Sequence, residues 1–270
     1  MSQQSSIEWT DVTWNPATGC SKVSEGCKFC YAETLALRLK AMGNARYDNG
    51  FEFTMHWDKI EEPRAWKKPR KVFVNSMSDL FHEQTDERFV RRVFEVMMDT
   101  PRHQYQILTK RPEKMAALLD EFIGDGLYRP SPHIWLGTSL EGPRVIKRLE
   151  ALKRVPAAVR FLSCEPLLGW FKEIDLGGID WVITGGESGI HLWNEKIRKR
   201  RALVEYVDGQ WVARPDRSRW VVGLRDHCLA QDVAFFFKQW GGNTPKAGGR
   251  VLEGRTWDEY PLAGRQGRVP

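Results

Sequence analysis

The sequence predicts an α/β fold: a full or partial parallel (β/α) barrel with an inserted β-hairpin near residues 202–213. Short apolar runs alternate with amphipathic runs along the chain. About seven of the apolar runs have the pattern of buried strands. The 270 residues would nearly fill one barrel of roughly 250 residues. An open doubly wound sheet has the same alternation, and both folds carry their sites at the carboxyl ends of the strands.

The expected strands are short, apolar and rich in β-branched or aromatic residues. They cover 13–19, 71–76, 104–109, 133–138, 159–164, 181–184 and 234–238. The expected helices carry apolar residues at helical spacing and begin at residues that favour helix starts, such as Asp86 and Pro112. The first expected helix begins after Thr85 and extends to Met97. The others cover 112–122, 143–154 and 220–231. Strands and helices that alternate in this way predict βαβ units.

One segment interrupts the alternation. Residues 202–213 contain Asp208-Gly209 between two alternating runs, which is a strong hairpin signal. The hairpin follows a basic run from Lys196 to Arg201, and we expect it on the active-site side of the sheet. We expect a single domain over 1–270, with an inserted segment at 190–219 and a Gly- and Pro-rich tail at 241–270 on the surface.

Composition excludes several classes of protein. Hydrophobic content of 41% is too high for a disordered chain, and no apolar run approaches the ~18 residues of a membrane span. The N-terminus lacks the basic and apolar stretches of a secretory signal. Five cysteines, an odd number, argue against a disulfide framework and predict a reducing cytoplasm. A net charge of +6 permits a polyanionic partner without requiring one.

Polar residues follow most of the expected strands, so we expect a shared pocket there. The candidates at or just beyond these strand ends are Ser76, Ser78, Asp79, Thr109, Lys110, Arg111, Cys164, Glu165, Gly185, Gly186, Glu187, Lys238 and Trp240. A single polar strand end is usually a helix cap, but a succession of them favours a site.

Three cysteines fall within eleven residues. Cys20, Cys27 and Cys30 have the spacing C-x6-C-x2-C, and Gly19 and Gly26 allow the loop to fold tightly. In a reducing compartment this pattern indicates metal ligation. A structural zinc would need a fourth ligand, and a catalytic zinc with three cysteines would be less common. A [4Fe–4S] cluster on three thiolates leaves one iron open. Three unligated thiols remain the simplest alternative.

The cysteine loop resembles that of the radical S-adenosylmethionine (SAM) superfamily, which usually reads C-x3-C-x-aromatic-C. The segment Cys27-Lys28-Phe29-Cys30 matches its second half, although six residues rather than three separate the first two cysteines. The loop and Leu108-Thr109-Lys110 are also distantly similar to spore photoproduct lyase and its relatives. A closer resemblance is to a phage-associated family of radical-SAM-like proteins. It rests on residues 7–11, 14–16, 185–189, 236–241 and 254–258.

The resemblance implies a TIM-like barrel, a [4Fe–4S] cluster on the three cysteines and SAM as the second cofactor. In the superfamily, the open iron binds SAM and an electron from a donor protein splits it, so that hydrogen is abstracted from a substrate. By analogy the SAM-binding candidates are Phe29, Ser76, Ser78, Asp79, Thr109, Gly185, Gly186 and Glu187. The glycine motif of the superfamily usually follows the second strand, whereas Gly185-Gly186-Glu187 follows the sixth expected strand.

The remaining candidates concern the substrate. Cys164, Lys110 and Glu187 are the candidate catalytic residues, and Arg111, Glu165, Lys238 and Trp240 are candidates for substrate binding. Structural ion pairs, or simple burial for Cys164, would explain them equally well. Twelve tryptophans, several beside basic residues, favour a DNA, RNA or nucleotide substrate, although tryptophans also fill cores.

Two other functions compete with this prediction. One is a non-enzymatic nucleic-acid-binding module with a structural three-cysteine metal site. The other is a radical SAM enzyme that acts on a small metabolite or a peptide. Salt-dependent binding to polynucleotides would separate nucleic-acid substrates from the latter. We expect Cys228 to be a packing residue, and the six histidines have no metal-ligand spacing.

Overall fold

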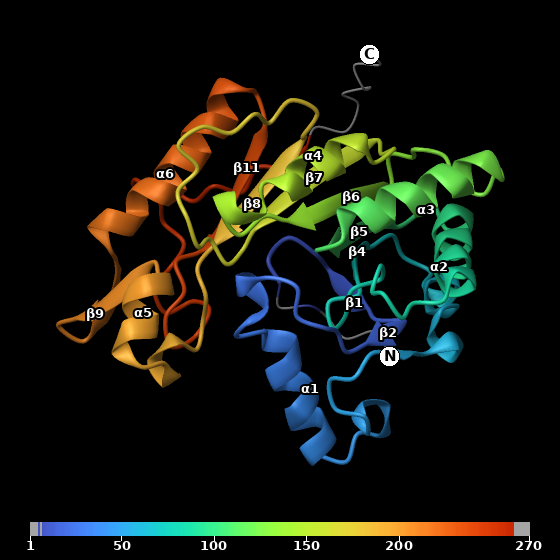
Figure 1. The fold of residues 1–270 in the computed structure, drawn as a ribbon, viewed down its shortest axis with the longest axis horizontal. Helices are drawn as coiled ribbons and strands as arrows, with labels where there is room; N and C mark the ends of the chain where they lie inside the picture. The colour runs from blue at the N-terminus through green and yellow to red at the C-terminus, as the bar shows by residue number, and fades with distance from the viewer. Residues whose placement is uncertain (1–4, 6, 262–270) are drawn as a thin grey trace. The chain divides into compact units, whose positions relative to one another are not determined.

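The computed structural model describes residue 5 and residues 7–261, which fall into two compact units. Unit 1 holds the described residues up to Thr138 and the segment Glu150–Val159, and unit 2 holds Ser139–Leu149 and the chain from Arg160 onward. A seven-stranded sheet has the strand order β1-β4-β5-β6-β7-β8-β11 (Figure 1). The fold is therefore α/β with a parallel, partial-barrel sheet, as predicted. The expectation of a single domain stays a prediction.

In unit 1 the main strands are β1 (Val12–Trp14), β4 (Lys71–Val74), β5 (Gln104–Thr109) and β6 (Ile134–Ser139). Each pairs in parallel with the next, and Val74 of β4 lies opposite both Trp14 and Ile107. The short strands β2 (Ala17–Thr18) and β3 (Thr54–Met55) pair antiparallel. The helices are α1 (Tyr31–Ala41), α2 (Glu87–Asp99) and α3 (Pro112–Gly124).

In unit 2 the strands β7 (Val159–Cys164), β8 (Trp181–Gly185) and β11 (Ala234–Gln239) pair in parallel. Helix α6 (Pro215–Ala230) packs against β8 and β11. Strands β9 (Val204–Val207) and β10 (Gln210–Ala213) form an antiparallel hairpin after helix α5 (Glu195–Arg201), which confirms the predicted insertion.

Helix α4 spans Lys147–Arg154. Single 3₁₀ turns lie at Glu25–Cys27, Ala45–Tyr47, Trp57–Lys59, Glu62–Ala65, Pro143–Val145 and Ile190–Leu192.

Helix α2 illustrates how the sequence pattern builds the core. The Asp86 side chain accepts a hydrogen bond from the backbone N–H of Arg88 and caps the helix. The predicted apolar face is fully buried, with Phe89 and Phe94 among its largest side chains. Burying one such side chain contributes roughly 1.5–3 kcal/mol, so the 3.6-residue periodicity alone fixes which face of α2 meets the sheet.

Several element boundaries differ from the predictions. Strand β4 ends at Val74 because Asn75 adopts a left-handed conformation with a φ of 58°. The segment 13–19 divides into β1 and β2 around Pro16, which has no N–H to donate. The helix expected at 143–154 begins as a 3₁₀ turn, and α4 proper starts at Lys147. Helix α6 begins at Pro215, five residues before Trp220, because proline is well suited to a first helical position.

The C-terminal tail contributes buried residues to unit 2. Trp257 is buried and packs its ring against Phe235 at a centroid distance of 5.8 Å. Its backbone carbonyl accepts a hydrogen bond from the N–H of Phe237, and Asp258 bridges antiparallel to Phe236. The tail therefore extends the edge of β11 as well as covering it, while residues 262–270 lie outside the described part. No helix among the described residues is long and apolar enough to cross a membrane.

Buried histidines should make the stability of unit 1 depend on pH. Burial lowers the pKa of His56, His82, His103 and His133 below the ordinary value. The unfolded chain then binds protons before the folded chain does, so stability should fall as the pH drops through about 6.5 and toward the folded pKa values.

The variant His133→Gln keeps a donor for the Met97 carbonyl, which the His133 ring contacts at 3.1 Å, but cannot be protonated. Its free energy of unfolding should fall less than that of the wild type between pH values about one unit above and one unit below 6.5. Denaturant titrations at the two pH values measure this. An identical pH dependence in both proteins would contradict the assignment of His133.

Candidate functional site

The cysteine loop connects β2 to α1 in unit 1 (Figure 1). It begins at Gly19, whose φ is 79° and where a Cβ atom would lie 2.1 Å from the carbonyl oxygen of Glu52. Only glycine fits there without moving the backbone. The Gly19 N–H donates to the Met77 carbonyl, and Gly19 bridges to Ser78. The loop therefore starts on the segment that follows the carboxyl end of β4.

The three cysteines of the loop are all partly exposed. Cys27 ends the 3₁₀ turn Glu25–Cys27, and Cys30 is the N-cap residue of α1. The structure thus places all three predicted ligands on one short loop. Within residue 5 and residues 7–261, however, no group of three or more His, Cys, Asp or Glu side chains has the arrangement of a metal site. The ligand assignment of these cysteines stays a prediction.

The nearest partners of the sulfur atoms are polar groups of the chain. The Cys20 Sγ lies 3.4 Å from the Ser21 carbonyl oxygen and 3.9 Å from Nη1 of Arg111, and the Cys27 Sγ lies 3.7 Å from the Ser24 hydroxyl. Burial, together with the Asp79 carboxylate, raises the pKa of the Cys20 thiol to about 11, although Arg111 opposes the shift. A cation bound at the loop would stabilise the thiolate form that metal ligation requires.

Beneath the loop, Asp79 is the centre of a buried hydrogen-bond network. Its Oδ1 accepts hydrogen bonds from the Thr109 hydroxyl at 2.7 Å and the Phe81 N–H at 3.0 Å. Its Oδ2 accepts from the Lys110 N–H and from Nη1 of Arg111, both at 3.0 Å. The structure therefore brings three of the predicted site residues, Asp79, Thr109 and Arg111, into one cluster that joins the ends of β4 and β5.

The two predicted serines also bind the chain itself. The Ser76 hydroxyl donates to Oδ1 of Asn15 at 3.1 Å, and the Ser78 hydroxyl donates to the Ala17 carbonyl at 2.9 Å. The Tyr31 hydroxyl, one residue after Cys30, donates to the Ser76 carbonyl at 2.6 Å. These contacts tie the segment 75–79 to the β1–β2 connection and to the start of α1. They give both hydroxyls a structural role, and their predicted contact with SAM is untested.

Asn75 is a candidate that the sequence prediction missed. Its side chain is buried, and neither its Nδ2 nor its Oδ1 has a hydrogen-bond partner in the part of the chain that the structure describes. An unpaired buried amide costs free energy and suggests that a polar ligand completes it. The sequence feature that could have pointed to Asn75 is its position directly after strand β4 and before Ser76. Together with three thiols on the neighbouring loop, this orphaned amide fits a site that takes polar cofactors.

Two other predicted residues of unit 1 have simpler surroundings. Phe29 is partly buried, and Nζ of Lys28 lies 5.6 Å from the centre of its ring. Lys110 is partly buried and is held by its backbone N–H on Asp79, at the carboxyl end of β5. Neither position rules out the predicted roles beside SAM.

In unit 2 the predicted residues form two separate ion pairs and a buried thiol. Cys164 ends β7 and is fully buried, which raises its pKa well above the ordinary value. Full burial gives Cys164 a packing role, and its predicted catalytic role is untested. Nζ of Lys238 contacts Oε1 of Glu165 at 2.7 Å, and both side chains are partly exposed. Cys228 is buried in α6, as expected of a packing residue.

The second ion pair holds Glu187. Arg201 donates from Nε to Oε2 at 2.9 Å and from Nη2 to Oε1 at 2.6 Å, with only 2% of the Arg201 side chain exposed. The glycines before Glu187 have a packing explanation as well. A Cβ atom at Gly186 would lie 2.1 Å from the carbonyl oxygen of Trp240. The Gly-Gly-Glu segment is therefore explained by backbone packing and a buried pair, and its predicted cofactor role is untested.

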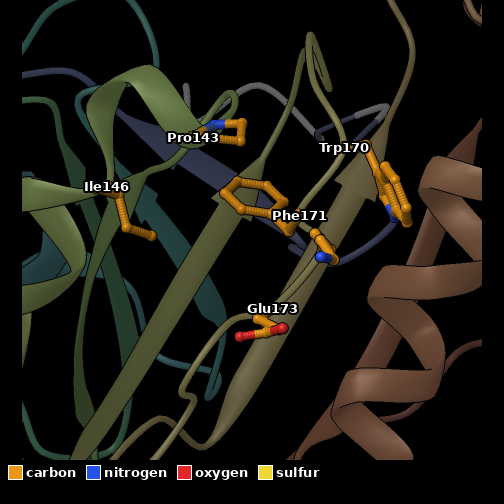
Figure 2. Close-up of a pocket in the computed structure, with 6 residues that line it drawn as sticks. Pro143, Ile146, Trp170, Phe171 and Glu173 are labelled. Atoms are coloured by element: carbon orange, nitrogen blue, oxygen red, sulfur yellow. The ribbon is translucent and has the colours of Figure 1, made fainter.

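A surface cavity of about 450 Å³ lies elsewhere in unit 2 (Figure 2). Its lining residues are Pro143, Ile146, Trp170, Phe171, Lys172 and Glu173. None of the predicted site residues lines it. The Trp170 ring that borders it also lies 5.5 Å from the guanidinium of Arg219 on α6.

Comparison with protein families identifies the chain at the level of family. The model of the family described as "Protein of unknown function (DUF5131)" matches residues 4–211 and 207–261. The chain belongs to this family. No match was found among curated protein sequences. The DUF5131 match includes both the cysteine loop and the basic hairpin segment.

Solved structures of spore photoproduct lyase share the fold of this DUF5131 chain. A cysteine-to-serine mutant matches with a TM-score of 0.54 at 14% identity. A complex with dinucleoside spore photoproduct matches with a TM-score of 0.50 at 13% identity. A double mutant with bound AdoMet and the same dinucleoside matches with 0.50 at 14%. Each alignment covers 88% of this chain and 78% of the other. At these identities the likeness establishes the fold alone.

Proposed function

We propose that this chain is a cytoplasmic radical SAM enzyme that modifies or repairs a nucleic acid or nucleotide. The observation that carries the proposal is the loop with Cys20, Cys27 and Cys30, which is fixed over the residues that follow β4 and β5. Sites of parallel α/β sheets lie at that end of the strands. The fold likeness to spore photoproduct lyase supports the same assignment.

In this proposal the three cysteines hold a [4Fe–4S] cluster, and SAM lies beside it. With both cofactors bound, the site would supply one-electron cleavage of SAM and abstraction of hydrogen from the substrate. The chain's own residues orient these groups. Asn75 offers a buried amide to a polar group of SAM, and Lys110 offers a positive charge to its carboxylate. Phe29 lies between two of the ligands and would pack beside the adenine.

A nucleic-acid substrate is supported by charge and by aromatic residues in unit 2. Residues 195–219 contain eight Lys and Arg against four Asp and Glu, a surplus that attracts phosphate groups. The Trp193 ring lies 5.8 Å from the guanidinium of Arg201. Two of the similar lyase structures hold a dinucleoside spore photoproduct. An electron donor protein would supply the reducing electron.

The test is anaerobic reconstitution of the purified chain with iron and sulfide, followed by reduction in the presence of SAM. We expect about four irons per chain, a brown colour and conversion of SAM to 5′-deoxyadenosine and methionine. Stoichiometric zinc without iron would overturn the proposal and favour a nucleic-acid-binding module with a structural metal.

The substrate class is tested separately, by binding of a single-stranded oligonucleotide at two salt concentrations. We expect affinity to fall steeply with salt, because phosphate contacts release counterions. Cleavage of SAM without any oligonucleotide binding would instead favour a small metabolite or a peptide as the substrate.

A further inference from the structure

The side chains of Arg111 and His82 contact Ser21 and hold the cysteine loop in place. The Ser21 hydroxyl accepts a hydrogen bond from Nη2 of Arg111 at 2.8 Å and contacts Nε2 of His82 at 2.9 Å. Nδ1 of His82 accepts from the Gln84 N–H, so Nε2 carries the proton and donates to Ser21. Two donors from two different strand ends thus converge on the residue next to Cys20.

Arg111 links this serine to the buried carboxylate of Asp79. Its Nη1 donates to Oδ2 of Asp79 at 3.0 Å and lies 3.9 Å from the Cys20 sulfur. The Arg111 and Asp79 side chains are only 9% and 7% exposed. A buried guanidinium that contacts a carboxylate, a hydroxyl and a thiol at once has a single orientation. Its Nε is buried and has no hydrogen-bond partner among the described residues.

We propose that Arg111 is a positioning residue that fixes the cysteine loop through Ser21 and sets the electrostatic environment of Cys20. Its predicted role in substrate binding is untested and stays a prediction. The effect of Arg111 on a cluster at Cys20 rests on the proposed function, whereas its effect on the loop does not. The loop contact itself involves only side chains of the protein.

The first arm of the test is hydrogen exchange of the full chain without iron. Arg111→Met and Ser21→Ala should each speed amide exchange in residues 19–30 by about tenfold or more, because a hydrogen bond from a charged group contributes at least that factor. Ser21 is exposed and uncharged, so Ser21→Ala keeps the fold even if Arg111→Met, which removes the ion-pair partner of Asp79, does not.

Arg148→Met is the matched control. Arg148 pairs with Glu141 at 2.8 Å in unit 2, and these side chains are 9% and 4% exposed. Its loss likewise removes a guanidinium from a buried carboxylate, but exchange in residues 19–30 should not change. The inference is overturned if the loop exchanges at the wild-type rate in Ser21→Ala, or if Arg148→Met speeds the loop as much as Arg111→Met does.

The second arm uses Arg111→Lys and the reconstituted cluster. A lysine keeps the charge beside Cys20 but cannot contact Asp79 and Ser21 together. It should restore the thermal stability and the midpoint potential of the cluster, yet leave the loop in fast exchange. Arg111→Met should lower the potential, because a positive charge near a ligand sulfur favours the reduced cluster. An unchanged potential in Arg111→Met overturns the electrostatic part.

The two proposals fail in distinguishable ways. If no chain binds iron but the loop exchange responds as expected, the proposed function fails and the loop contact stands. If iron binds and SAM is cleaved while the loop exchange does not respond in Arg111→Met or Ser21→Ala, the function stands and this inference is wrong.

Discussion

Replacement of Cys27 by alanine should abolish binding of the iron–sulfur cluster. A [4Fe–4S] cluster on three cysteines has no spare protein ligand, so the loss of one thiolate removes a third of its attachment to the chain. Cys27 is partly exposed at the end of a 3₁₀ turn, so the substitution leaves no large cavity. The melting temperature of the chain without iron should therefore stay within a few degrees of wild type.

Iron and sulfide content after anaerobic reconstitution measures this effect. Cys228→Ala is the matched control, because Cys228 is buried in α6 and contributes only packing. Its iron content should equal that of the wild type. Full iron content in Cys27→Ala would show that the ligand assignment is wrong.

Glu187→Ala should be among the most destabilising substitutions in unit 2. It would leave the Arg201 guanidinium, which is 2% exposed, without its bidentate partner. Breaking a buried pair in this way costs about 3–5 kcal/mol. For a chain of this size that corresponds to a fall in melting temperature on the order of 10 °C.

Two further variants show whether the buried charge is the cause. Glu187→Leu combined with Arg201→Met removes both charges and should recover most of the lost stability. Lys199→Ala breaks the exposed pair between Lys199 and Glu195 on neighbouring α5, and should change stability by less than about 1 kcal/mol. Thermal unfolding compares all three. If Glu187→Ala were as stable as the wild type, Glu187 would not be needed for folding and would be available for cofactor binding.

Local patterns in the sequence predicted the elements, but not the contacts between them. The periodicity of α2 and the runs of β5 and β7 were enough to place them, because burial on one face or both faces leaves a visible pattern. The cysteine spacing likewise located the candidate loop. By contrast, the pairing of Asp79 with Arg111 joins residues 32 positions apart, and the residue types alone fit a ligand contact equally well.

Glycine and asparagine residues at the strand ends are ambiguous in the sequence for a related reason. Gly185-Gly186 has the composition of a ligand-binding turn, yet at Gly186 the missing Cβ makes room for the backbone of Trp240. Asparagine is a residue type common in turns, yet the amide of Asn75 is buried without a hydrogen-bond partner in the described part of the chain. Only tertiary packing decides whether the space beside such a residue is filled by the chain.

The long-range anchoring of the cysteine loop also determines when it forms. The loop and the segment just before it are held by contacts between residues 61 and 90 positions apart, those of Ser78 with Ala17 and of Arg111 with Ser21. Closing such distances costs chain entropy, which is recovered only once β4 has paired with both β1 and β5. The loop is therefore completed late in folding. A nascent or partly folded chain has the three thiols but no fixed loop, so iron should be loaded onto the folded protein.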